Sequence, residues 1–88
     1  MNRKEFCEKI TSYYDDFTEK NTLPRLEAYC IVLDEIEEYL KKKYDELDYD
    51  WLIKEILKNH ENFRFAPAPA VLFKLVKEKK SNEYNPYL

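Results

Sequence analysis

The stretch NFRFAPAPAVLFKLVKEKK, residues 62–80, decides the fold of this chain. It sets Pro67 and Pro69 among alternating alanines, between an aromatic pair and an apolar run. Each proline removes a backbone donor and disfavours the helical region at the residue before it, so FRFAPAPA cannot lie inside a helix. Pro69 suits the first turn of a new helix, whose apolar face is formed by Val71, Leu72, Leu75 and Val76. The sequence therefore predicts a proline joint that turns a short last helix back onto the preceding elements.

The aromatic residues before the prolines alternate around Arg64 in a segment that we expect to be extended. Since side chains alternate along an extended chain, Phe63 and Phe65 lie on one side, and we expect both rings to turn inward.

Three amphipathic segments precede the joint. The first, residues 3–17, follows Asn2, which stands at capping-box spacing from Glu5. The second starts near Pro24 and continues to about residues 44–47, and the third is capped by Asp48 or Asp50 and ends near Glu61. We therefore predict an all-α fold, a small bundle of three to four helices with the proline-rich joint before the last helix. Residues 1–80 form a single helical domain, and residues 81–88 form a flexible C-terminal tail.

Composition narrows the function classes. The chain has 88 residues and no glycine, which disfavours the glycine-dependent turns of nucleotide-binding loops and tight β-hairpins. No apolar run approaches the roughly 20 residues of a membrane span, and the start, MNRKEFCEK, has no apolar segment typical of a signal peptide. We expect a cytoplasmic protein with no membrane partner.

The residues that could carry chemistry have simpler structural explanations. His60 is the single histidine, and Cys7 and Cys30 lack the clustered spacing of metal ligands. Both cysteines fall on predicted buried helix faces, where a free thiol acts as a small hydrophobe; a redox pair is the less favoured alternative because there is no Cys-x-x-Cys. No nucleophile has a paired base in a recognisable motif. We expect no metal, no cofactor and no enzymatic activity.

Charge is distributed unevenly along the chain. Residues 1–73 hold 11 Lys and Arg against 16 Asp and Glu, a net charge of −5, whereas residues 74–88 hold 4 against 2, a net charge of +2. Because non-specific DNA binding is mostly phosphate neutralisation, we expect no direct DNA binding by this body. The carboxylates could instead form an acidic face that occupies a nucleic-acid channel, as in some small phage inhibitors, including anti-CRISPR proteins. That face would comprise Asp34, Glu35, Glu38, Asp45, Glu46, Asp48 and Asp50.

The order of the elements and the proline joint resemble the phage helicase loader/inhibitor family, small all-α proteins that bind a replicative helicase. In that family a motif F-P-P-T-[IV]-A-[DE]-[IL] opens the last helix. Residues 65–72, FAPAPAVL, match it at Phe65, Pro67, Ala70 and Leu72, and depart from it at the other four positions, among them Ala66, Ala68 and Val71. The resemblance implies an adaptor in DNA replication that binds no nucleotide and loads or inhibits the helicase.

Two protein-binding hypotheses follow. The first, favoured by the resemblance, is an adaptor for a replicative helicase or its loader that binds through the joint, the last helix and the tail. Its contact residues would be Phe65, Pro67, Phe73, Lys74, Lys77, Tyr84 and Tyr87. The second is an inhibitor that blocks a host nucleic-acid enzyme through the acidic face. The eight tyrosines of the chain suit either hypothesis, because tyrosine is enriched at interfaces.

Overall fold

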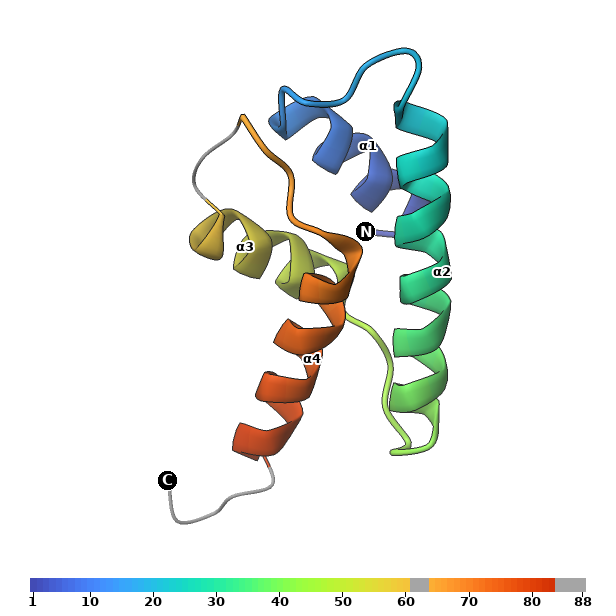
Figure 1. Ribbon diagram of the computed structural model, residues 1–88. Coiled ribbons are helices and arrows are strands. Elements are labelled where there is room, and N and C mark those ends of the chain that lie inside the picture. The colour runs from blue at the N-terminus through green and yellow to red at the C-terminus, as the bar shows by residue number, and fades with distance from the viewer. Residues whose placement is uncertain (61–63, 84–88) are drawn as a thin grey trace.

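The protein is all-α. The computed structural model describes residues 1–60 and 64–83, which form four helices and no strand. The helices are α1 (Arg3–Tyr13), α2 (Thr22–Lys41), α3 (Tyr49–Asn59) and α4 (Pro69–Glu83) (Figure 1). The predicted all-α bundle with a proline joint before its last helix is thus confirmed.

Helix α1 begins as predicted but ends four residues early. Asn2 accepts a hydrogen bond from the Glu5 amide (2.9 Å), which caps the helix. At the other end Tyr14 is already extended, although its N–H still bonds the Ile10 carbonyl. Asp15 and Asp16 follow, and carboxylates are unfavourable at the negative end of a helix dipole. The predicted end at residue 17 was wrong for this reason.

Helix α2 starts at Thr22, which places Pro24 in its first turn, and ends at Lys41. It stops before residues 44–47 because Tyr44 adopts a left-handed conformation (φ 57°). The Asp45 and Tyr44 amides donate to the carbonyls of Leu40 (2.9 Å) and Lys41 (3.1 Å), the paired bonds of a Schellman motif. In this chain without glycine, a tyrosine with a fully exposed side chain occupies the position that glycine usually takes.

Helices α3 and α4 follow their predicted start signals. Asp48, not Asp50, caps α3, accepting a hydrogen bond from the Trp51 amide (3.1 Å). Pro69 opens α4 as expected. Helix α4 continues to Glu83, so residues 81–83 are helical and the predicted boundary of the tail at residue 81 was too early. Residues 84–88 lie outside the described part of the chain.

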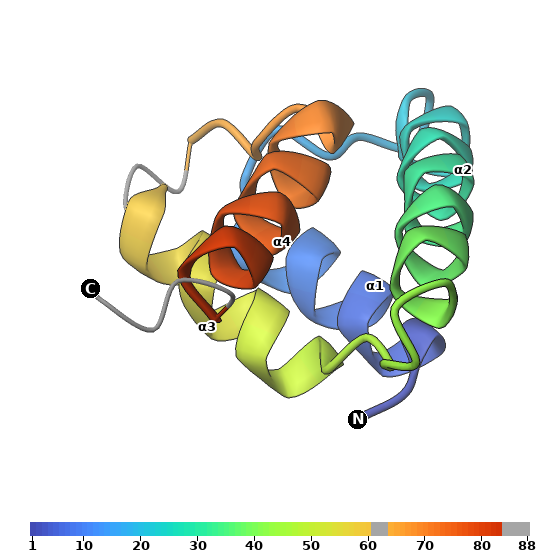
Figure 2. The ribbon, with the colours of Figure 1, turned by 90° about the horizontal axis from the view of Figure 1, so that it is seen from below.

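The core is formed by one face of every helix. Leu33 and Ile36 at the centre of α2 are completely buried, as are Phe6 and Leu72 on neighbouring helices. Helix α4 packs against α2 and α3, and α1 packs against α3. Figure 2, viewed nearly along their axes, shows α2 and α4 side by side. The buried core residues are Phe6, Ile10, Tyr14, Tyr29, Leu33, Ile36, Leu40, Tyr49, Leu52, Ile53, Ile56, Leu72 and Val76.

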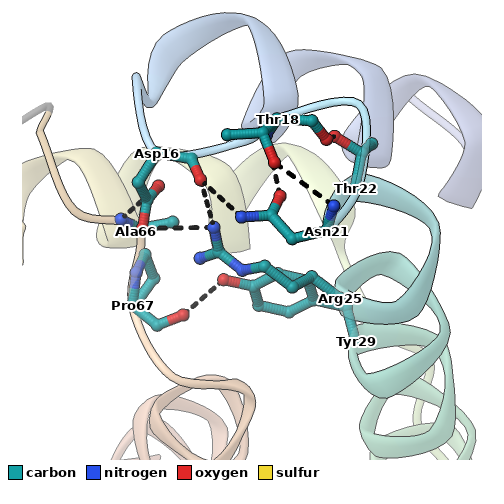
Figure 3. Close-up of polar contacts among 8 residues, drawn as sticks. All are labelled: Asp16, Thr18, Asn21, Thr22, Arg25, Tyr29, Ala66 and Pro67. Atoms are coloured by element: carbon teal, nitrogen blue, oxygen red, sulfur yellow. Dashed lines mark hydrogen bonds and ion pairs between the residues drawn. The ribbon is translucent and has the colours of Figure 1, made fainter.

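The proline joint is tied to the loop between α1 and α2 (Figure 3). One carboxylate oxygen of Asp16 accepts the backbone N–H of Ala66 (3.1 Å), and the other forms an ion pair with Arg25 (3.1 Å). The Asp16 carbonyl accepts from Arg25 and from the side-chain amide of Asn21, both at 3.0 Å. We name Asp16, Arg25 and the Ala66 amide the Asp16 lock.

A second contact lies one residue further along the joint. The buried hydroxyl of Tyr29 donates to the carbonyl of Pro67. Burial raises the pKa of Tyr29 to about 12, so the hydroxyl keeps its proton as a donor at neutral pH. Since prolines carry no N–H, the joint crosses the bundle with few donors to satisfy, and its Ala66 amide and Pro67 carbonyl both have partners.

Phe65 does not turn inward. Its side chain is 61% exposed, because the backbone, rather than this ring, makes the contact with Asp16. Phe63 lies outside the described residues.

Replacing Asp16 with alanine should destabilise the fold by about 2 kcal/mol. The substitution leaves the Ala66 amide and the half-buried Arg25 guanidinium without their carboxylate, and hydrogen bonds to charged groups are worth about 1.5–3 kcal/mol. Urea unfolding measures the change. Asp15→Ala is the matched control. Asp15 is the exposed residue next to Asp16, and its replacement should change the free energy of unfolding by less than about 0.5 kcal/mol. Equal effects of the two substitutions would contradict the lock.

Replacing Tyr44 with glycine should stabilise the protein relative to Tyr44→Ala. Both substitutions remove the same exposed ring, but only glycine adopts the left-handed conformation without steric cost. We expect the free energy of unfolding of Tyr44→Gly to exceed that of Tyr44→Ala by roughly 0.5–1 kcal/mol, measured by urea titration. Equal stability, or a more stable alanine variant, would argue against the left-handed turn.

Candidate functional site

A groove lies between α2 and α4. Its volume is about 800 Å³, and it is open to solvent along α4. Val32 and Glu35 line it from α2, and Phe73, Lys74 and Lys77 line it from α4. The groove lies where α4 packs against α2.

An aromatic pair spans the two helices at this groove. The rings of Tyr39 on α2 and Phe73 on α4 meet edge to face, with 5.4 Å between their centroids. The Lys77 ammonium lies 4.4 Å from the centroid of the Phe73 ring, and Lys43 lies 5.2 Å from that of Tyr39. Both rings are half-buried. Such a surface offers apolar area with cations beside it, and lysines on exposed stems can move aside when a partner covers the rings.

A second, smaller hollow of about 450 Å³ adjoins the groove. It is lined by Asp34, Glu35, Glu38, Tyr39, Lys42 and Phe73. Because Glu35 and Phe73 line both hollows, the two form one continuous surface over α2 and α4. Both hollows are lined by lysines as well as by carboxylates.

The structure brings together part of the predicted adaptor surface. Phe73, Lys74 and Lys77 line the same groove. Phe65 is exposed, but it lies in the joint before α4. Pro67 is buried and its carbonyl bonds Tyr29, so its assignment as a contact residue is corrected to a structural role. Tyr84 and Tyr87 lie outside the described residues.

The predicted acidic face is largely occupied by contacts within the protein. Asp34 pairs with Arg3 (2.7 Å), Asp45 pairs with Lys80, and Asp50 pairs with the amino terminus (3.2 Å). Asp48 caps α3. Glu35 and Glu38 line the hollows beside α4, whereas Glu46 lies in the loop after α2. The seven carboxylates therefore do not form one free acidic surface.

Arg3 is the residue that sequence reasoning missed most clearly. Its guanidinium donates to Asp34 (2.7 Å), to Glu37 (2.7 Å) and to the Tyr49 hydroxyl (3.1 Å), which links α1, α2 and α3. Burial opposes its charge, but the hydrogen bonds with Tyr49 and Asp34 outweigh this and raise the pKa of Arg3. The sequence could not reveal this cluster, because residues 3 and 34 are far apart in the chain. The i,i+3 and i,i+4 spacing rules predict contacts only between neighbours on one helix.

Lys80 and Asp45 form a second unpredicted pair. The Lys80 side chain is only about 10% exposed, and it joins α4 to the loop after α2. The hydrogen bond from Lys80 holds the pKa of the Asp45 carboxyl below its ordinary value.

The described residues contain little that suggests metal chemistry. Among residues 1–60 and 64–83, no three His, Cys, Asp or Glu side chains are grouped so that they could hold a metal ion. His60 ends α3, where its backbone carbonyl accepts a hydrogen bond from the Tyr14 hydroxyl (2.8 Å). Within the same residues, no helix combines the length and apolar character needed to cross a membrane.

Comparison with known proteins adds no family assignment. No protein-family model matches the chain, and no curated protein or solved structure shows significant similarity to it. The functional argument therefore rests on the residues and geometry of the groove.

Replacing Asp45 with asparagine should lower the melting temperature at pH 7, because the buried Lys80 ammonium loses its charged partner. The folded-state pKa of Asp45 lies below its unfolded value, so its stabilisation is complete above the unfolded pKa of about 4 and is lost as the pH falls through the folded pKa. The melting temperatures of the wild type and of Asp45→Asn should therefore converge as the pH falls below about 4.

Thermal unfolding followed by circular dichroism between pH 7 and pH 2 measures this convergence. The matched control is Glu46→Gln, which removes the adjacent exposed carboxylate. A difference between wild type and Asp45→Asn that stays constant with pH would contradict the pairing.

Proposed function

We propose that this protein is a non-enzymatic adaptor that binds a protein partner through the groove between α2 and α4. The observation that carries the proposal is the half-buried Tyr39 and Phe73 pair, flanked by Lys74 and Lys77. The resemblance of the joint to phage helicase loaders supports a replicative helicase or its loader as the partner, which the adaptor would load or inhibit.

The chemistry of the groove supports a peptide-like ligand rather than a small metabolite. Small molecules are usually bound in pockets that enclose most of their surface, whereas this hollow is open along its length. An amphipathic helix or an extended segment could cover the groove, with an apolar side chain against Phe73 and carboxylates near Lys74 and Lys77. Binding energy would then concentrate in the aromatic pair, as is typical of interface hot spots.

The acidic inhibitor has less support than the adaptor. Four of its seven proposed carboxylates, Asp34, Asp45, Asp48 and Asp50, are engaged within the fold. Of the remaining three, Glu46 lies in the loop after α2, whereas Glu35 and Glu38 lie beside lysines, so the field around them is mixed rather than uniformly negative. A mimic of nucleic acid needs a run of unpaired negative charge.

Affinity capture from a bacterial lysate with mass spectrometry tests the adaptor. The wild-type protein should recover a replicative helicase or its loader. Phe73→Ala, and separately the double charge reversal Lys74→Glu with Lys77→Glu, should reduce recovery at least tenfold, a change of about 1.4 kcal/mol or more in binding free energy. Each variant is scored only at a temperature at which circular dichroism shows native helicity.

Two control variants separate the effect of the groove from effects of net charge and of the acidic face. Lys9→Glu with Lys54→Glu changes the net charge equally at exposed positions on α1 and α3, and should leave recovery unchanged. Glu35→Lys with Glu38→Lys reverses two of the three remaining carboxylates of the acidic face without touching the cap of α3. If the Phe73→Ala variant still recovered the partner as well as the wild type does, the groove would not be the binding site. A nuclease or other nucleic-acid enzyme that is captured by the wild type and lost from the Glu35 and Glu38 variant would favour the acidic inhibitor.

A further inference from the structure

One face of the molecule carries opposite charges on its two helices. Helices α2 and α4 pack side by side (Figure 2). Helix α2 holds five Asp and Glu against two Lys and Arg, a net charge of −3, whereas α4 holds four Lys against two Glu, a net charge of +2. Lys42 after α2 and Glu78 on α4 go against this pattern, and both line the hollows. Because the hollows run across both helices, the acidic and basic parts belong to one continuous surface, which we name the α2–α4 face.

Four charges on this face have no ion-pair partner within the part of the chain that the structure describes. Glu35 and Glu38 on α2 form no ion pair there, and neither do Lys74 and Lys77 on α4. All four side chains are exposed. Unpaired charges of both signs on one face favour a partner that presents the same two signs in the opposite arrangement.

The spacing of these charges is the same on the two helices. In each row an apolar residue is followed four positions later by a charge, and three positions after that by a second charge of the same sign. The acidic row is Ile31, Glu35 and Glu38 on α2, and the basic row is Ala70, Lys74 and Lys77 on α4. Side chains at these spacings lie on one side of a helix. The two rows can therefore be matched residue by residue.

The two rows also lie at the same level along the molecule. Helices α2 and α4 run in the same general direction (Figure 1), and Glu35 lines the same hollow as Ala70 and Lys74. A twofold axis parallel to the groove keeps the level along the helices but exchanges their sides, so α2 of one copy comes to lie over α4 of the other. The acidic row of each copy then faces the basic row of the other.

We propose that the α2–α4 face binds a second copy of this chain and forms a symmetric dimer. In this dimer Glu35 of each copy pairs with Lys74 of the other. One turn further along the groove, Glu38 of each copy pairs with Lys77 of the other. Each contact occurs twice, because a twofold interface is self-complementary.

Apolar contacts and the size of the face set the strength of the dimer. Ile31, which the monomer leaves 62% exposed, packs against the exposed Ala70 of the other copy. Helix α4 has 15 residues, so the face is about 22 Å long and about 20 Å wide, and each copy buries roughly 450 Å². Stable complexes bury about 800 Å² per partner. We therefore expect a dissociation constant on the order of 100 μM at low salt.

Under the proposed adaptor function, self-association would regulate the groove. The second copy covers Phe73 and the lysines beside it, so a helicase or loader would have to displace that copy before binding. This consequence rests on the proposed function, whereas the dimer itself does not. The experiments below therefore use the purified full chain alone.

Sedimentation velocity over a range of concentrations tests the dimer. At about 0.05 M NaCl the wild type should be mainly monomeric at about 10 μM and mainly dimeric at about 1 mM. Raising the salt to about 0.5 M should weaken the association by roughly fivefold or more, because the ion pairs at the interface are screened.

A charge exchange tests which surfaces meet. Glu35→Lys with Glu38→Lys makes both rows positive, and Lys74→Glu with Lys77→Glu makes both rows negative. Each variant alone should lose the dimer, with a dissociation constant at least tenfold higher than that of the wild type. An equimolar mixture should dimerise again, because every row then faces a row of opposite sign. Lys9→Glu with Lys54→Glu, at exposed positions on α1 and α3, is the control for net charge and should dimerise like the wild type.

The apolar contact has its own matched pair of variants. Ile31→Gln should weaken the dimer by roughly threefold or more, because it removes an apolar side chain from the interface. Leu23→Gln is the control, because Leu23 is 71% exposed on the same helix but lies beyond the level at which α4 begins (Figure 1). It should leave the association unchanged.

Three results would overturn the proposal. They are a wild type that stays monomeric at about 1 mM and low salt, charge variants that each dimerise alone as well as the wild type does, and a mixture of the two variants that stays monomeric while both show native helicity by circular dichroism. The first would leave the α2–α4 face to a different protein. It is read on the wild type, so the proposal stays testable even where a variant folds poorly.

Discussion

Asp16 joins two segments that are far apart in the sequence, and the position of the last helix depends on it. Its carboxylate accepts the Ala66 amide and pairs with Arg25, while its carbonyl accepts from Arg25 and Asn21. A single residue thus orders the loop between α1 and α2 and holds the joint before α4. The prolines make this possible with few bonds, since they limit the conformations of the joint and remove donors that would otherwise need partners. The Tyr29 hydroxyl completes the attachment at the Pro67 carbonyl.

The candidate binding surface follows from this attachment. Because the joint fixes where α4 begins, Phe73 meets Tyr39 on α2, and the lysines of α4 stand over the groove between the helices. The Lys80 and Asp45 pair holds the other end of α4 against the loop after α2. Helix α4 is therefore held at both ends by polar contacts and in the middle by Leu72 and Val76. A partner that binds the groove would meet a surface that is already formed, which lowers the entropic cost of association.

The sequence predicted the local features of this molecule better than its long-range contacts. The Asn2 cap, the first-turn prolines and the helical face of Leu33 and Ile36 were readable because their partners lie within a turn or two. Three features were not readable, because each depends on tertiary proximity or on backbone conformation. Arg3 binds carboxylates 31 and 34 residues away, the Ala66 amide finds Asp16 across 50 residues, and Tyr44 takes a left-handed conformation usually reserved for glycine. The same limit applies to the site: Phe73, Lys74 and Lys77 could be named together from one helix, but neither the Tyr39 contact nor the burial of Pro67 could be.

Hydrogen exchange at the Ala66 amide, followed by NMR on the native protein, tests the central claim most directly. Ala66 lies outside every helix, so without the Asp16 lock its amide should exchange as fast as that of a solvent-exposed loop. With the lock, the Ala66 amide can exchange only when the joint separates from the loop between α1 and α2. We therefore expect the protection factor of the Ala66 amide to lie within about tenfold of that of the Leu33 amide at the centre of α2. Exchange of the Ala66 amide at the rate of an unstructured peptide, while Leu33 stays protected, would contradict the account.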